Sequence, residues 1–147
     1  MDPNKKVIAG ESPNAYDVVN YPLLSISQTH IGRLSALGWL FGMDPVHPSE
    51  ARVLELGCGS GTNLLAMAQL FPEGRFVGVD YSKSQIEVAL EATKASGIRN
   101  VQFLYADICE LDRDLGEFDY IISHGVYSWI PDSAKAALLR ISKENLS

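Results

Sequence analysis

The 147 residues of the chain are enough for one ordinary domain with a single core. Apolar residues make up 46% and charged residues 20%, as in folded soluble domains and unlike disordered chains. The formal charge of -6 argues against a broad nucleic-acid-binding surface, because such surfaces depend on clustered Lys and Arg. We therefore expect a small-molecule or protein substrate and no nucleic-acid partner.

The two cysteines, Cys58 and Cys109, form no CxxC pair and have no histidines clustered around them. This pattern predicts reduced thiols, with neither a disulfide framework nor a metal site. Residues 1–12 are polar, and no segment approaches the roughly 20 apolar residues of a membrane span. The sequence favours a cytoplasmic protein without membrane contact.

The amino-terminal part of the chain differs in character from the rest. Residues 1–22 combine prolines, asparagines and a glycine with few apolar anchors, which is typical of a tail or a lid-like arm. A helix is predicted from Ile31 to Phe41, with Gly42 as its stop signal, and a proline-containing linker follows at 44–48. We accordingly divide the chain into an arm and helix, 1–48, and a main domain, 49–147.

The main domain alternates short apolar runs with helical patterns. Strands are predicted at 53–56, 75–79, 101–105 and 118–123, and helices at 61–71, 82–97 and 132–145. Strands that alternate with crossover helices form a parallel sheet, so we expect an α/β fold whose ligand lies beyond the carboxyl ends of the strands. The core-facing helical residues should be Leu64, Leu65, Ala68, Phe71, Ile86, Ala89, Leu90, Thr93, Ala134, Ala137, Leu138 and Ile141.

Three alternating glycines, Gly57, Gly59 and Gly61, join the first predicted strand to the next helix. Without Cβ atoms the backbone can turn sharply, and a ligand can approach it closely. A tight turn without a ligand is the alternative. The dinucleotide fingerprint GxGxxG is not matched, because Thr62 stands where its last glycine belongs, although the glycines alone leave a variant NAD site open.

Two aspartates follow the next two strands. Asp80 can accept hydrogen bonds from both hydroxyls of an adenosine ribose, or it can cap the following helix. Asp107 can accept from an adenine amino group while Ile108 packs on the ring, or it can be a simple turn residue. Since parallel strands bring the glycine loop and both aspartates to one edge of the sheet, their convergence predicts a nucleoside site.

The segments Val53–Gly61, Phe76–Ser82, Ala106–Ile108 and Phe118–Ser123 resemble the successive motifs of class I S-adenosylmethionine-dependent methyltransferases. The resemblance implies a Rossmann-like sheet with flanking helices, S-adenosylmethionine as the cofactor and methyl transfer as the reaction. It also implies that the glycine loop passes the methionine moiety and that Glu55 holds the amino group of that moiety. An ion pair with a neighbouring cation is the alternative for Glu55. The implied cofactor-binding set is Glu55, Gly57, Cys58, Gly59, Gly61, Asn63, Asp80, Tyr81, Asp107, Ile108 and His124.

A narrower resemblance lies in Ser123–Pro131, with Gln28–His30 upstream, to bacterial methyltransferases that carry a carboxyl-terminal methyltransferase regulatory domain. It implies that this chain is the amino-terminal, cofactor-binding part, truncated after the fourth strand and the following helix. The fourth strand should then lie at an unpaired sheet edge, which favours a homodimer or strand exchange.

His124 follows the fourth strand, where family members line the acceptor pocket, and it can take a proton from a hydroxyl or protonated amine. A histidine satisfied by loop backbone is the alternative. Tyr127 and Trp129 can wall that pocket or simply pack, and Tyr16 and His30 can close over the cofactor or serve packing. Three functions stay open: a methyltransferase of unidentified acceptor, a non-catalytic S-adenosylmethionine-binding fragment or sensor, and a nicotinamide-dependent oxidoreductase.

Overall fold

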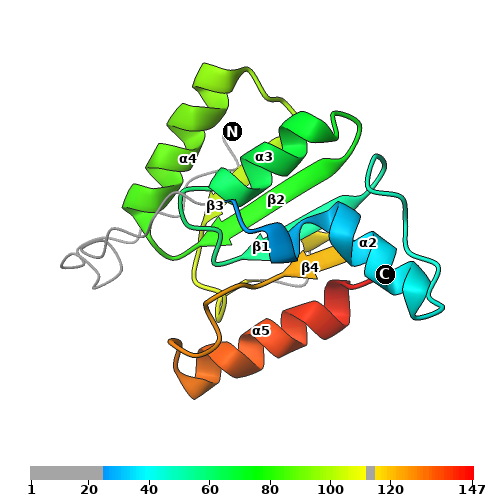
Figure 1. The fold of residues 1–147 in the computed structure, drawn as a ribbon. Coiled ribbons are helices and arrows are strands. Elements are labelled where there is room, and N and C mark those ends of the chain that lie inside the picture. The colour runs from blue at the N-terminus through cyan, green and yellow to red at the C-terminus, as the bar shows by residue number, and fades with distance from the viewer. Residues whose placement is uncertain (1–24, 112–114) are drawn as a thin grey trace.

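The computed structural model describes residues 25–111 and 115–147, and within them four parallel strands form one sheet. The strands are β1 (Arg52–Leu56), β2 (Arg75–Asp80), β3 (Val101–Tyr105) and β4 (Tyr120–Ile122), and they stand in the order β3-β2-β1-β4. β2 and then β3 therefore lie on one side of β1, and the chain returns to place β4 on the other side of β1. This α/β, Rossmann-like architecture confirms the predicted fold class (Figure 1).

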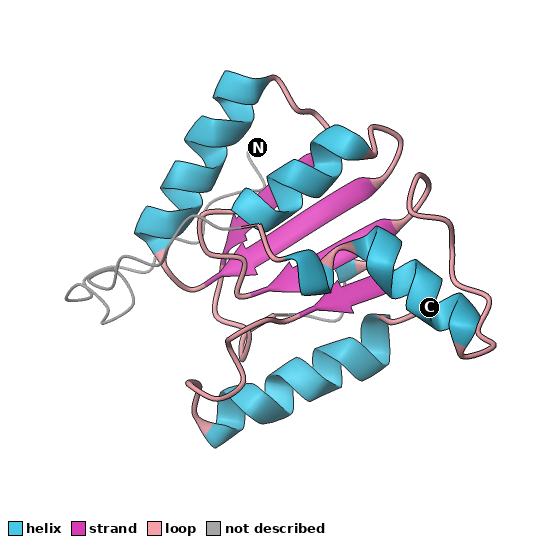
Figure 2. Cartoon of the chain, in the orientation of Figure 1, coloured by secondary structure: helices cyan, strands magenta, loops and turns pink. Residues whose placement is uncertain are grey.

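Helices cover both faces of the sheet, as expected for right-handed crossovers between parallel strands (Figure 2). Three helices lie over one face and α5 lies over the other (Figure 1). The elements are η1 (Ser27–Thr29), α2 (Ile31–Leu40), α3 (Thr62–Leu70), α4 (Lys83–Ser96) and α5 (Asp132–Asn145).

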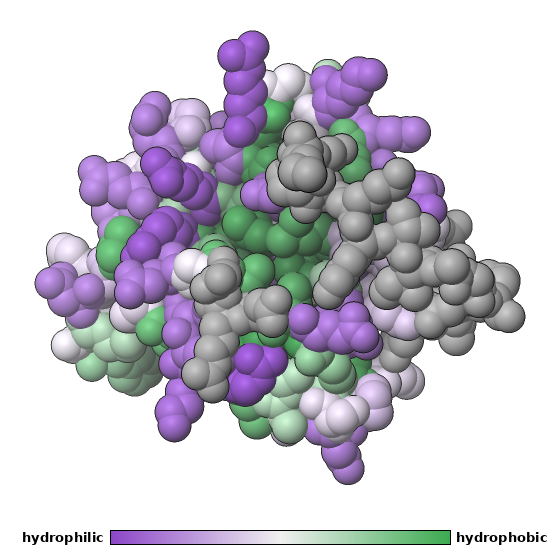
Figure 3. Space-filling model, turned by 180° about the vertical axis from the view of Figure 1, so that it is seen from behind, coloured by the Kyte–Doolittle hydropathy of each residue, from purple (hydrophilic) through white to green (hydrophobic). Residues whose placement is uncertain are grey.

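Side chains alternate between two core layers because successive strand residues point to opposite faces. Val53 lies level with Phe76 of β2, and both belong to the core layer under α2, α3 and α4. Leu54 belongs to the layer that α5 covers, together with Val79 and Ile141. Viewed from behind, the surface has an apolar centre bordered by hydrophilic residues (Figure 3).

The helix boundaries follow the predicted signals. Gly42 and Gly97, with φ of 78° and 70°, adopt the left-handed conformation that ends α2 and α4. The Ser82 hydroxyl accepts a hydrogen bond from the Gln85 N–H at 3.3 Å, which caps the start of α4. Gly61 is the N-cap of α3 rather than its first residue.

Some core predictions were wrong in detail. Leu90 is 49% exposed, because the buried stripe of α4 is limited to Ile86 and Ala89. In α3 the predicted stripe missed Met67, which is fully buried, while Leu65 is only partly buried. The four core positions predicted for α5 are all buried, and this prediction is confirmed.

The predicted fourth strand was too long at both ends. β4 covers only Tyr120–Ile122, and Phe118 forms an isolated parallel bridge with Leu146. The Phe118 N–H donates to the Asn145 carbonyl at 2.8 Å, and the Ser147 N–H donates to the Phe118 carbonyl at 3.0 Å. The edge beside β4 is therefore partly occupied near Phe118, although it was predicted to be unpaired.

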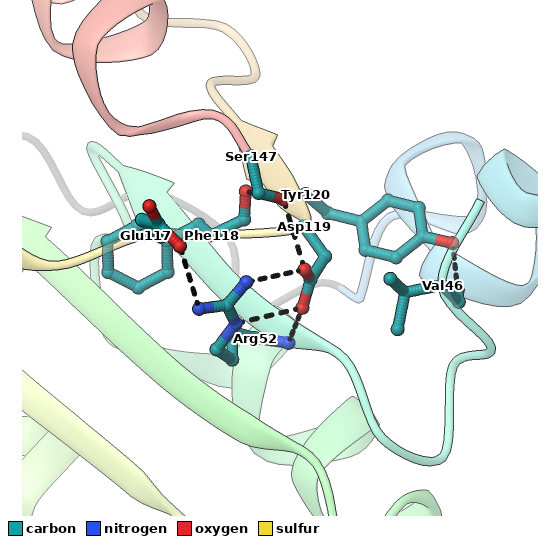
Figure 4. Close-up of polar contacts among 7 residues, drawn as sticks. All are labelled: Val46, Arg52, Glu117, Phe118, Asp119, Tyr120 and Ser147. Carbon is teal, nitrogen blue, oxygen red and sulfur yellow. Dashed lines mark hydrogen bonds and ion pairs between the residues drawn. The ribbon is translucent and has the colours of Figure 1, made fainter. Parts of the chain in front are cut away.

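The amino ends of β1 and β4 are joined by an ion pair (Figure 4). Asp119 Oδ2 accepts from the Arg52 backbone N–H at 2.7 Å and from Nε at 3.2 Å, and Oδ1 accepts from Nη2 at 2.9 Å. The Ser147 hydroxyl donates to Oδ1 at 3.1 Å. One carboxylate thus links both strands to the residues that follow α5. Over the described ranges, no helix has the length and apolar character needed to cross a membrane.

Candidate functional site

The loops after β1, β2 and β3 lie side by side at the carboxyl edge of the sheet. The Gly57 and Cys58 N–H groups both donate to the Val79 carbonyl, at 2.8 and 3.1 Å. The Ala106 N–H donates to the Asp80 carbonyl at 3.1 Å, which ties the loop after β3 to the end of β2. The chain crosses from β3 to β4 on the other side of β1, so this edge contains the topological switch point where open α/β sheets bind ligands.

The three glycines of the loop have different surroundings, although all have positive φ. A Cβ on Gly57 would overlap the Val126 side chain, and a Cβ on Gly61 would overlap the Phe103 ring. Among the described residues, a Cβ on Gly59 would meet only Gln85 Oε1, at 3.9 Å. Gly59 is therefore the glycine of this loop whose open side leaves room for a ligand.

Asp80 ties the glycine loop to the start of α4. Its Oδ2 accepts from the Gly59 N–H at 2.7 Å, and its Oδ1 accepts from the Ser82 N–H at 2.8 Å. The capping alternative is thus part of what Asp80 does, because it orders the turn before α4. Each carboxylate oxygen can accept a further hydrogen bond, so these contacts do not exclude ligand binding.

Glu55 is a buried acidic residue on β1, 4% exposed. Its Oε1 accepts from Asn63 Nδ2 at 2.8 Å, so an amide takes the place of the cation expected in the alternative interpretation. Among the described residues, Glu55 Oε2 is one of two buried side-chain oxygens without a hydrogen-bond partner. Burial, opposed by the Asn63 bond and reinforced by the nearby Asp80 charge, raises the pKa of Glu55 to about 7.

The second such oxygen is Ser123 Oγ, just beyond β4, the strand beside β1. Sequence reasoning did not single out Ser123, because a serine that follows a strand has no distinctive pattern. Cys58 is also buried, and desolvation raises the pKa of its thiol far above the ordinary value, so this thiol stays neutral. Two groups at the ends of β1 and β4 therefore lack the partners that buried polar atoms normally have.

Two tyrosines, Tyr81 just after β2 and Tyr105 at the end of β3, lie next to each other. The rings of Tyr81 and Tyr105 stack with centroids 6.3 Å apart and an interplanar angle of 29°. Asp107 Oδ1 accepts from the Cys109 N–H at 2.8 Å, which is the turn role considered as its alternative. Ile108 is partly buried against the core layer of α5. Sequence reasoning missed Tyr105, whose ring is brought to Tyr81 only by strand pairing.

The predicted acceptor residues lie in the loop between β4 and α5. His124 and Trp129 are exposed, Trp129 to 73%, so Trp129 does not pack into the core. Tyr127 is half-exposed, with the Lys135 ammonium 5.7 Å from its ring centroid. His30 caps α2 by accepting from the Gly32 N–H at 3.2 Å. Tyr16 lies outside the described residues.

Two surface hollows lie at the opposite, amino-terminal edge of the strands. One is lined by charged residues that include Arg52, Glu73 and Arg75, and the other extends to Gln102 of β3. Neither contains a residue of the predicted cofactor-binding set. The buried polar atoms and the glycine loop of the candidate site therefore lie at the edge of the sheet opposite to these hollows.

A parallel sheet with a glycine loop after β1 and carboxylates on β1 and at the end of β2 defines a nucleotide- or nucleoside-binding α/β protein. A family described as methyltransferase domain matches residues 47–144, and the chain belongs to this family.

The chain is similar to two Rickettsia prowazekii proteins that have been named only as uncharacterized. One is 40% identical over 91% of this chain and 24% of its own length, and the other is 38% identical over 90% and 53%. The solved structure of PKMT2 from Rickettsia typhi in complex with AdoHcy superposes with a TM-score of 0.84 at 38% identity. That match covers 87% of this chain and 25% of PKMT2. The chain thus spans between about a quarter and about half the length of these relatives.

Proposed function

We propose that this chain provides the cofactor-binding part of an S-adenosylmethionine-dependent methyltransferase. The observation that carries the proposal is the buried, unpartnered Glu55 Oε2 beside the glycine loop and Asp80. Membership of the methyltransferase-domain family supports it, as does the AdoHcy bound to the similar PKMT2.

The residues at the carboxyl edge fit the chemical groups of S-adenosylmethionine. A buried carboxylate oxygen without a partner suits a ligand ammonium group, which removes the cost of leaving that oxygen unpaired. Asp80 presents carboxylate oxygens of the kind that bind ribose hydroxyls, and Gly59 leaves space beside the loop among the described residues. Tyr81 and Ile108, at the ends of neighbouring strands, can contact a flat base.

S-adenosylmethionine supplies an already activated methyl group, so methyl transfer is a direct displacement that depends mainly on alignment. The part of this chain is to bind and orient: Glu55 would hold the amino group of the cofactor, and Asp80 would hold its ribose hydroxyls. His124, exposed just beyond β4, can accept a proton from a hydroxyl or ammonium acceptor.

The acceptor is proposed to be a small molecule or a protein, because the net charge of -6 disfavours nucleic acid. We further propose that the chain corresponds to the amino-terminal part of a longer methyltransferase with a regulatory domain, in a cytoplasmic setting. The greater length of the relatives and the free thiols of Cys58 and Cys109 support these proposals.

Calorimetric titration with AdoHcy and with NAD tests the cofactor. AdoHcy should bind and NAD should not. Replacing Asp80 by Ala should weaken AdoHcy binding at least about tenfold, because a lost pair of acceptor bonds costs more than about 1.4 kcal/mol. Thermal melting of the same sample separates this loss from unfolding, since Asp80 also orders two backbone N–H groups.

The matched control is Glu87→Ala, which removes an exposed carboxylate from α4 that pairs only loosely with Lys83, at 3.9 Å. AdoHcy affinity should be unchanged in this control. Binding of NAD without binding of AdoHcy would overturn the proposal, and an unchanged titration for a folded Asp80→Ala protein would overturn the assignment of Asp80.

A further inference from the structure

The Asn63 side chain is the centre of a polar network beneath the candidate site. It is 5% exposed and lies in the first turn of α3. Its Nδ2 donates to Glu55 Oε1 at 2.8 Å and to Thr29 Oγ1 at 3.0 Å, while its Oδ1 accepts from the Ile26 N–H at 3.1 Å. Both amide hydrogens are used, so Asn63 has no donor left for a ligand.

The partners permit only one orientation of this amide. In the flipped orientation the amide oxygen would face the Glu55 carboxylate, and the NH₂ group would face the Ile26 N–H. The Thr29 hydroxyl donates its own hydrogen to the Ile26 carbonyl at 3.0 Å, so toward Asn63 it acts as an acceptor. Asn63 is therefore held rigidly by contacts on both sides.

This arrangement controls which oxygen of Glu55 is free. Because Asn63 holds Oε1, the oxygen that remains buried and unpartnered is Oε2. The same amide also joins β1 to the segment around η1. Its partners there, Thr29 and Ile26, precede Asn63 by 34 and 37 residues in the sequence. The Asn63 side chain thus contacts both the Ile26–Thr29 segment and the Glu55 carboxylate, and it helps to hold both in place.

We propose that Asn63 is a positioning residue that aims Glu55 Oε2 at the amino group of the cofactor and holds the Ile26–Thr29 segment beside it. This inference rests on the proposed function. It replaces the direct contact between Asn63 and the cofactor that the resemblance implied.

The proposal predicts a pH signature. Within residues 25–111 and 115–147, the ionisable groups that interact with Glu55 are Asp80 and the neutral thiol of Cys58, and η1 and α3 carry no ionisable side chain. Glu55 binds an ammonium group as the carboxylate, so AdoHcy affinity should fall as the pH drops through its pKa of about 7. The Asn63 bond lowers that pKa, so removing the bond should move the fall to higher pH.

The experiment compares two ligands by calorimetry across this pH range: AdoHcy, and methylthioadenosine, which lacks the amino-acid group. Asn63→Ala should weaken AdoHcy binding at least about tenfold, since a hydrogen bond to a charged group is lost. Methylthioadenosine binding should be unchanged, and the pH midpoint for AdoHcy should rise. Thr29→Val, which removes one hold on Asn63 but keeps its bond to Glu55, should weaken AdoHcy binding less and leave methylthioadenosine binding and the pH midpoint unchanged. Its control Thr29→Ser, which keeps the hydroxyl, should bind as the unaltered protein does.

Each outcome is decisive. In Asn63→Ala, equal weakening of both ligands or an unshifted pH midpoint would overturn the role of Asn63 and leave the proposed function intact; in Thr29→Val, equal weakening of both ligands would do the same. If the unaltered protein bound neither ligand, the proposed function itself would fail. If Asn63→Ala does not fold, Thr29→Val carries the test, because it removes one hydroxyl and leaves the Asn63 and Glu55 contact in place.

Discussion

At the scale of single residues, the three glycines of the loop after β1 have different roles, although they are chemically identical. Gly57 and Gly61 make room for Val126 and Phe103, which are contributed by the loop before α5 and by β3. Gly59 has no close neighbour on its Cβ side among the described residues, and its N–H donates to Asp80. All three glycines have positive φ, and packing adds a further requirement for glycine at Gly57 and Gly61, while access for a ligand adds one at Gly59.

Alanine substitutions should separate these tasks. Gly59→Ala should keep the fold at a cost of about 1 kcal/mol for an alanine at positive φ, but weaken AdoHcy binding at least about tenfold because its methyl group occupies the ligand side. Gly57→Ala should lower the melting temperature far more, because its Cβ overlaps Val126. Thermal melting with calorimetry checks both. Equal loss of stability in the two variants would contradict this division.

At the scale of elements, the Arg52 and Asp119 ion pair fixes the register of β1 against β4. Only three residue pairs connect these strands, so their alignment has few backbone contacts to define it. The Asp119 side chain is 6% exposed and receives four hydrogen bonds, including one from Ser147 (Figure 4). Charge-assisted bonds to a nearly buried carboxylate are stronger than surface ion pairs.

Replacing Asp119 by Ala should lower the free energy of unfolding by about 1–3 kcal/mol near neutral pH. Its hydrogen bonds to Arg52 hold the pKa of Asp119 below the ordinary value of 3.8. The stabilisation is therefore fully present above 3.8 and is lost as the pH falls through the lowered pKa, so the two proteins should converge in acid.

Urea denaturation near neutral pH and in acid, below the lowered pKa of Asp119, measures this difference in stability. The matched control is Glu117→Gln, because Glu117 reaches the same Arg52 at 3.6 Å from a side chain that is 73% exposed. Its stability should stay within about 0.5 kcal/mol of the unaltered protein. A loss for Glu117→Gln as large as that for Asp119→Ala would contradict the assigned role.

At the scale of the whole molecule, the sheet ends at β4 among the described residues. β4 pairs with β1 on one side, and on the other side the contacts involve Phe118 and the residues after α5. An apolar strand with an incompletely paired edge can bind the equivalent strand of a second copy.

We expect the isolated 147-residue chain to form homodimers through this edge. The mass measured by light scattering should rise with protein concentration and return to the monomer value on dilution. A strictly monomeric mass at high concentration would contradict the expectation, and it would not affect the cofactor assignment.

The sequence alone determined the fold class, most helix ends and the sheet edge at which the glycine loop and Asp80 lie. These features follow from local rules: apolar periodicity distinguishes strands from helices, Gly42 and Gly97 end helices by adopting positive φ, and parallel strands place their carboxyl ends together. Asp80 was predicted at this edge, and its carboxylate bonds the Gly59 N–H there.

Only the tertiary structure decided which glycine is open, how long β4 is and what Asn63 does. Each of these depends on residues far apart in the chain, such as Val126 on Gly57, Leu146 beside Phe118, and Thr29 on Asn63. Such contacts form only when the chain has folded, because they are defined by the shape and hydrogen-bonding needs of both partners. No local sequence pattern contains that information.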